Sequence, residues 1–119
     1  QESRGLGDVY KRQVYPSGYA LILADGQIRA RFRKSFERPE PMKPGKVYEV
    51  TIDLGPTSNL FERGHKIRVD ISSSNFPRFD RNPNTGESIA TATELVNAMQ
   101  TIHHSPWAPS RIVLPVVKA

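Results

Sequence analysis

The side chains that most often break bonds are few in this chain and stand in no catalytic pattern. A serine nucleophile on a strained elbow needs a Gly-x-Ser-x-Gly frame, because only small neighbours fit that turn, and no serine here has it. The three histidines are His65, His103 and His104; the last two are adjacent, and adjacent residues of a strand point to opposite faces, so we do not expect them to share a metal. The absence of cysteine excludes thiolate nucleophiles and zinc–thiolate sites. We therefore predict no catalytic residue, no metal and no cofactor for this chain.

Oxygen-bearing side chains recur at alternate positions between Asp80 and Gly86, which is the spacing of a calcium-binding loop. The glycine stands one position too late, however, and no acidic residue occupies the position of the bidentate ligand. Pro83 also stiffens the loop. We interpret the segment instead as a turn-rich loop in which Asp80 pairs with Arg78 or Arg81 and the asparagines cap turns.

One basic cluster stands out against a net charge of +5, and it consists of Arg29, Arg31, Arg33, Lys34 and Arg38. Three arginines on one strand face could follow a phosphate backbone. The exposed aromatic side chains that usually stack on bases are not interleaved with them, since Phe32 falls on the opposite face. We favour a solvated or paired surface and predict no nucleic-acid partner.

Composition and length indicate one small folded domain. The chain has 119 residues, of which 37% are hydrophobic and 24% charged. Ten prolines and eight glycines oppose long helices. No apolar run approaches the roughly 20 residues that span a bilayer, so we predict no membrane association.

The elements that must position these residues read as short strands separated by turns. Apolar and polar residues alternate with a period of two in several segments, as in a strand with one buried face; Ile67, Val69 and Ile71 are one such inward row. Asp25-Gly26 predicts a tight turn, and only residues 89–98 have helical character. We therefore predict an all-β fold, a jelly-roll-like β-sandwich. The expected strands are 19–23, 27–33, 46–54, 65–73, 98–103 and 110–117, with a proline-rich loop at 37–45.

The first thirteen residues, QESRGLGDVYKRQ, differ from the rest because they show no apolar period. Residues 8–13 resemble a translated sequencing adapter, the kind of segment that is set aside in fold reasoning. A naturally disordered N-terminus is the alternative. We expect residues 1–13 to be non-native or disordered and residues 14–119 to be the β-domain.

Several stretches together resemble one family, the C-terminal β-domain of X-Pro dipeptidyl-peptidase-like hydrolases, which include cocaine esterase and α-amino-acid ester hydrolase relatives. The resemblance covers nearly all of residues 14–119, and Ser73–Asn82 is its most specific part. The segments that carry it are Asp25–Arg33, Pro44–Val50, Gly64–Val69, Ser72–Gly86, Gln100–Ile102 and Pro109–Pro115.

The resemblance implies a parent serine hydrolase with an α/β-hydrolase domain, a helical cap and a jelly roll placed last. Its Ser-Asp-His triad would precede Val14, and so would the opening strands of the jelly roll. The chain is therefore expected to be an N-terminally truncated, non-catalytic jelly roll that helps shape the substrate cleft. Its expected partner is the catalytic domain of the same parent chain, which hydrolyses esters or X-Pro peptides.

One loop is the expected contact with that catalytic domain. It combines aromatic side chains and arginines, which are enriched in protein interfaces, with polar groups. Its anchors would be Phe76, Phe79 and Arg81. The predicted contact residues are Asn75, Phe76, Pro77, Arg78, Phe79, Asp80, Arg81 and Asn82.

A different kind of function stays open. The chain could be a free-standing β-sandwich module that binds a carbohydrate or another ligand. Such a module needs exposed flat aromatic side chains, for which Trp107, Tyr15 and Tyr19 are the candidates. The sequence predicts no aromatic stripe among them.

Overall fold

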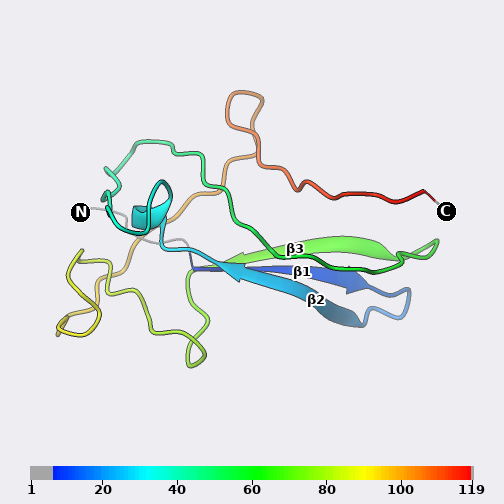
Figure 1. Cartoon of the computed structure of the whole chain (residues 1–119), viewed down its shortest axis with the longest axis horizontal. Helices are drawn as coiled ribbons and strands as arrows, with labels where there is room; N and C mark the ends of the chain where they lie inside the picture. Colours follow the sequence, from blue (N-terminus) through cyan, green and yellow to red (C-terminus); the bar gives the residue numbers. More distant parts are fainter. Residues whose placement is uncertain (1–6, 119) are drawn as a thin grey trace.

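The computed structural model describes residues 7–118 and contains one open antiparallel sheet (Figure 1). The strands are β1 (Asp8–Val14), β2 (Ala20–Gln27) and β3 (Lys66–Ser72), in the order β2-β1-β3, and a single turn of 3₁₀-helix, η1, spans Ala30–Phe32. The all-β prediction is confirmed, and the open sheet is of the kind that forms one layer of a β-sandwich. No helix within residues 7–118 is long and apolar enough to cross a membrane.

The central strand β1 carries the most buried face of the sheet. Val9 lies between Gly26 of β2 and Ile71 of β3. Val9, Lys11 and Gln13 point to the same face because strand side chains alternate, and all three are buried. The register with β2 shifts between Lys11 and Arg12, where a β-bulge interrupts the ladder.

The domain boundary that the sequence predicts at Val14 falls inside β1. Residues 8–13 show no apolar period because three of the four buried positions, Asp8, Lys11 and Gln13, are polar or charged. Alternation of hydrophobicity therefore gives no signal for this strand. The adapter-like origin of the segment stays a prediction, and its first six residues lie outside the described part of the chain.

Two of the expected strands form. Residues 19–23 fall largely within β2 and residues 65–73 contain β3. The tight turn predicted at Asp25-Gly26 is wrong, because β2 continues through both residues to Gln27. Glycine is needed there for a close approach of another segment rather than for a turn, since a Cβ on Gly26 would lie 2.6 Å from the carbonyl oxygen of Asp53.

The other expected strands join no ladder in residues 7–118. Residues 27–33 contain η1, and residues 46–54, 98–103 and 110–117 carry no strand. The helical character expected at 89–98 is limited to a turn in which Thr91 N and Ala92 N donate to the carbonyl of Ser88. The loop expected at 37–45 has no regular structure, as its prolines require.

The segment 46–60 runs along the buried face of β1 through residues 52–60 instead of pairing with a strand. Near the start of β1, Ile52 and Leu54 approach Gly26, the β2 residue that pairs with Val9. At the other end Gln13 bonds to residues 59 and 60: its side-chain amide donates to the carbonyl of Leu60 at 3.2 Å and accepts from Asn59 at 3.1 Å. Segment 46–60, with its alternating pattern, therefore packs on the sheet without forming a strand.

The inward row expected on β3 is half exposed. Ile67, Val69 and Ile71 share the face of Val9, but they stand on an edge strand. The contacts of segment 46–60 described above are with β1 and β2, so the edge strand keeps its apolar side chains in partial contact with solvent. The expectation that this row is buried is therefore wrong for this chain.

Candidate functional site

The loop that holds the predicted contact residues is closed by its own side chains and backbone. Phe79 N donates to the carbonyl of Asn75 at 3.0 Å, which makes a compact turn. The guanidinium of Arg81 lies 4.7 Å from the centre of the Phe76 ring, and that of Arg78 lies 5.3 Å from the Phe79 ring. Two cation–aromatic pairs therefore shape the loop, each worth about 0.5–1 kcal/mol when exposed.

Three arginines attach the loop and the residues that follow it to the rest of the chain. Arg78 forms an ion pair with Asp25 of β2. Arg29 donates to the backbone carbonyl of Asp80 at 3.3 Å, and Arg31 donates to the carbonyls of Gly86 and Glu87, each at 3.5 Å. In Figure 1 the turn η1 and the loop accordingly lie at the same end of the sheet. Partial burial and the neighbouring charge of Arg31 lower the pKa of Arg29.

The predictions for the acidic and the amide side chains of the loop have different outcomes. The expected pairing of Asp80 with Arg78 or Arg81 is wrong for the described residues, because Arg78 pairs with Asp25 and the Arg81 guanidinium lies over the Phe76 ring. The expected capping role of the asparagines is confirmed for Asn82, whose side-chain oxygen accepts from Asn84 N at 3.1 Å.

The outward surface of the loop is both aromatic and cationic. Phe76 is 56% exposed, and Pro77, Arg78, Asp80 and Arg81 are exposed as well. Asn75, Phe79 and Asn82 are half-buried and hold the loop together. Of the three expected anchors, Phe76 and Arg81 are therefore presented to solvent as a stacked pair, whereas Phe79 is half-buried beside Arg78.

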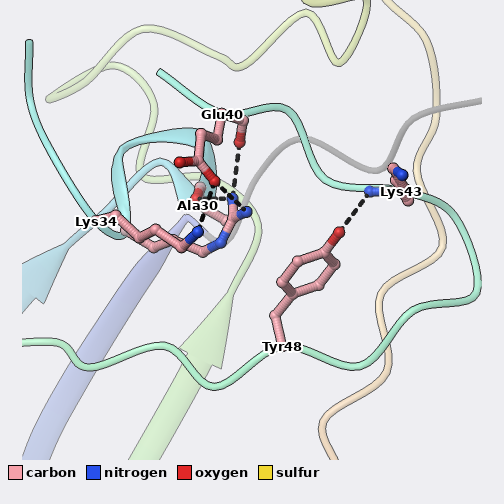
Figure 2. Close-up of polar contacts among 6 residues, drawn as sticks. Ala30, Lys34, Glu40, Lys43 and Tyr48 are labelled. Atoms are coloured by element: carbon pink, nitrogen blue, oxygen red, sulfur yellow. Dashed lines mark hydrogen bonds and ion pairs between the residues drawn. The ribbon is translucent and has the colours of Figure 1, made fainter. Parts of the chain in front are cut away.

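Two further members of the basic cluster, Arg33 and Lys34, are engaged within the chain (Figure 2). Arg33 donates to the carbonyls of Ala30 at 3.0 Å and Glu40 at 2.7 Å and lies 3.5 Å from the Glu40 carboxylate. Lys34 pairs with the same carboxylate at 2.8 Å. The hydrogen bond from Lys34, reinforced by Arg33, lowers the pKa of Glu40. These contacts support the interpretation of a paired surface rather than a phosphate-binding one.

The Arg33 guanidinium also lies 4.4 Å from the centre of the Tyr48 ring. The hydroxyl of Tyr48 accepts a hydrogen bond from the backbone N of Lys43 at 3.0 Å (Figure 2). Residues 30–48 are thereby closed into one unit around a single arginine. Sequence reasoning missed this network, because its acceptors are mostly backbone carbonyls.

Beside this unit is an open hollow of about 280 Å³. Phe32 and Phe36 stack there with ring centres 6.3 Å apart. Four of the lining residues are apolar and six are polar or charged: Gln27, Ile28, Phe32, Arg33, Lys34, Ser35, Phe36, Thr51, Ile52 and Asp53.

His65 and His103 take part in packing rather than in a cluster of ligands, and His104 is exposed. Nδ1 of His65 accepts from the side-chain amide of Gln13 at 2.7 Å, and its ring lies 4.5 Å from that of Tyr15. His103 lies 5.1 Å from the Trp107 ring. No group of three or more histidine, aspartate or glutamate side chains able to hold a metal ion occurs in the described residues.

The aromatic side chains weighed for carbohydrate binding form one small group that the sequence did not predict. The rings of Tyr15 and Tyr19 lie 5.8 Å apart at the β1–β2 hairpin, but their planes are inclined by 45°. Trp107 instead packs beside His103, inclined by 53°. Inclined rings give no flat platform, so the geometry does not favour the binding-module alternative.

Comparison with known proteins assigns the fold to a family. Residues 9–113 match the model of the X-Pro dipeptidyl-peptidase C-terminal non-catalytic domain. The chain is 48% identical over 107 residues to the cocaine esterase of a Rhodococcus species, covering 88% of this chain and 19% of that protein. It is also 29% identical, over 133 aligned positions, to a protein of Mycobacterium bovis named as a candidate serine esterase, covering 98% of this chain.

A protein of Mycobacterium tuberculosis with a corresponding name matches equally well. The chain spans about a fifth of the length of each of these relatives. The match with the family model includes the whole sheet except Asp8, and it includes the loop Asn75–Asn82 together with Arg29 and Arg31. The chain belongs to the family of X-Pro dipeptidyl-peptidase C-terminal non-catalytic domains.

Proposed function

We propose that this chain is the non-catalytic C-terminal domain of an ester-hydrolysing serine hydrolase, and that it packs on the catalytic domain of the same parent protein and helps wall the substrate cleft. The observation that carries the proposal is the match of residues 9–113 to a domain described as non-catalytic, together with 48% identity to a cocaine esterase. All three relatives described above are named as esterases, which favours esters over X-Pro peptides as substrates of the parent.

In such a parent the chemistry belongs to the catalytic domain. A serine would attack the ester carbonyl, a histidine would transfer the proton, and an oxyanion hole would stabilise the developing charge. This chain contributes position and shape. Substrate placement within about 1 Å has large effects on rate, so a domain that only walls the cleft can still change turnover.

The proposed contact with the catalytic domain is the loop Asn75–Asn82. Its outward Phe76 and Arg81 are of the types that form energetic anchors in interfaces. Arg78 ties the loop to β2, and Arg29 ties it to the segment between β2 and η1, so the anchors are presented on a fixed support. A supported anchor loses less conformational entropy on docking than a free loop would.

A chimera tests the proposal. The matched segment of the Rhodococcus cocaine esterase is replaced by that of this chain, and Phe76→Ala and Arg81→Ala are introduced singly and together. We expect each variant to lower the melting temperature of the chimera and the double variant to lower it further, because docking area is lost.

The same substitutions in the isolated chain separate docking from local stability. Phe76 is 56% exposed in the chain alone, so its removal should change the melting temperature of the isolated chain far less. Val113→Ala, at another exposed apolar residue, is the matched control. Chimeras whose Phe76 and Arg81 variants melt like the Val113 control would contradict docking through this loop.

A further inference from the structure

We propose that the hollow between Ile28–Phe36 and Thr51–Asp53 receives an apolar side chain of the catalytic domain, so that this hollow and the loop Asn75–Asn82 form one docking surface. The inference rests on the proposed function and adds a second, apolar contact to it. It identifies the hollow as a site for a protein side chain and not for a small molecule.

The size and lining of the hollow indicate what it takes. Its volume of about 280 Å³ is at or below the lower end of small-molecule sites, which range from roughly 300 to 1,000 Å³. Ile28, Phe32, Phe36 and Ile52 supply apolar walls. A pocket of this size and lining suits one large aliphatic or aromatic side chain, as in the anchor pockets of protein interfaces.

The charged side chains around the hollow already have partners within the chain, so they do not favour a charged occupant. Arg33 is only 7% exposed, and its guanidinium is engaged by two backbone carbonyls and by Glu40. Lys34 pairs with the same carboxylate. Asp53 accepts a hydrogen bond from Gly55 N at 2.7 Å. An ionic ligand would have to displace these partners, whereas an apolar side chain leaves them in place.

Phe36 adds an anchor of this domain's own beside the hollow. Its side chain is 84% exposed, although one face of the ring stacks on Phe32. A large aromatic side chain beside an apolar hollow is an arrangement typical of interface centres, where aromatic residues are enriched. Phe36 therefore lines the hollow and also offers an exposed ring to the same partner.

The position of the hollow on the fold supports the catalytic domain as that partner. The segment 28–36, which forms one wall, is tied to the loop by Arg29 through Asp80, and Arg31 ties it to Gly86, four residues beyond the loop. The hollow and the proposed contact loop are therefore connected parts of one end of the molecule. The chain covers 19% of the cocaine esterase, so most of that protein lies outside the matched segment and can supply the partner surface.

Cysteine accessibility tests the inference, because the chain has no cysteine of its own. Phe36→Cys, Phe76→Cys and Met99→Cys are made singly in the isolated chain and in the chimera, after the chimera's other cysteines have been changed to serine. Met99 is 92% exposed and serves as the control. Reaction with a maleimide is followed under native conditions, and the chimera is used only after it has been shown to hydrolyse an ester.

We expect the thiol at position 36 to react on the order of tenfold more slowly in the chimera than in the isolated chain, with no change at position 99. Protection at position 76 without protection at position 36 overturns this inference and leaves the proposed function standing. Protection at neither position contradicts both. Phe36→Cys at the aligned position of the Rhodococcus esterase repeats the measurement in a natural full-length protein, and should a chimera fail to fold, that measurement decides alone.

Discussion

Gly26 of β2 lies against the backbone of Asp53 so closely that a Cβ at Gly26 would stand 2.6 Å from the Asp53 carbonyl oxygen. Real Cβ atoms essentially never approach another heavy atom so closely. This contact sets the distance between segment 46–60 and the face of the sheet that it covers. The segment could not cover the buried face of β1 at this distance if residue 26 had a side chain.

Gly26→Ala is therefore expected to destabilise the chain. Overpacking of this kind costs about 1–3 kcal/mol, because either the covering segment or the strand has to move. The free energy of unfolding in urea measures the effect. Gln27→Ala, at the exposed next residue of the same strand, is the control and should change stability much less. Equal effects of the two substitutions would show that the close approach does not hold the segment.

The same contact explains which strands could be predicted from the sequence. Alternation predicts a half-buried extended segment, and both 46–54 and 65–73 have that pattern. Only the second pairs with a neighbouring strand, and nothing in the pattern distinguishes the two. β1 is a strand that lacks the alternating pattern, because the polar residues Lys11 and Gln13 occupy its buried face, and it was therefore not predicted.

Arg33 and Lys34 are neighbours with different structural roles, and their substitution should show it. Arg33→Ala removes a buried guanidinium from two backbone carbonyls and should lower the free energy of unfolding by about 2–3 kcal/mol. Lys34→Ala removes an exposed ion pair and should cost no more than about 1 kcal/mol. Arg33→Lys should not restore stability, because a single ammonium cannot span the same acceptors. Full rescue by lysine would contradict the role given to the guanidinium.

The ion pair between Arg78 and Asp25 should contribute a small, salt-sensitive coupling. A double-mutant cycle with Arg78→Ala and Asp25→Ala is expected to give about 0.2–1 kcal/mol at low salt and less at high salt. The pair Arg111–Glu49, whose atoms are 3.5 Å apart and whose side chains are both largely exposed, is the comparison and should show less coupling. Coupling that is no larger for Arg78–Asp25 would mean that this pair does not hold the loop to β2.

Stability should fall on acidification through Asp70. Its hydrogen bond with Arg68, with a further contribution from Arg12, lowers the pKa of this carboxyl in the folded chain. The resulting stabilisation is fully present above the ordinary value of about 4 and is lost as pH falls through the lower folded value. Melting temperatures between pH 2 and pH 6 should therefore fall less steeply for Asp70→Asn and for Arg68→Ala than for the unsubstituted chain. Identical profiles for all three proteins would contradict the assignment.

The candidate site was predictable only in part. The residue types of loop 75–82 predict a contact surface, and that contact stays a prediction, whereas the family match supports the partner in outline. What the sequence could not indicate is how the loop is held. Arg29 and Arg31 bind backbone carbonyls, which leave no trace in residue types, and Arg78 reaches across 53 residues to Asp25.

Ester turnover by the purified chain tests the central claim most directly. The chain alone should hydrolyse p-nitrophenyl acetate no faster than buffer, whereas the chimera that joins its matched segment to the catalytic part of the Rhodococcus cocaine esterase should hydrolyse it catalytically. Turnover by the isolated chain that disappears when one of its own serines or histidines is replaced would contradict the account.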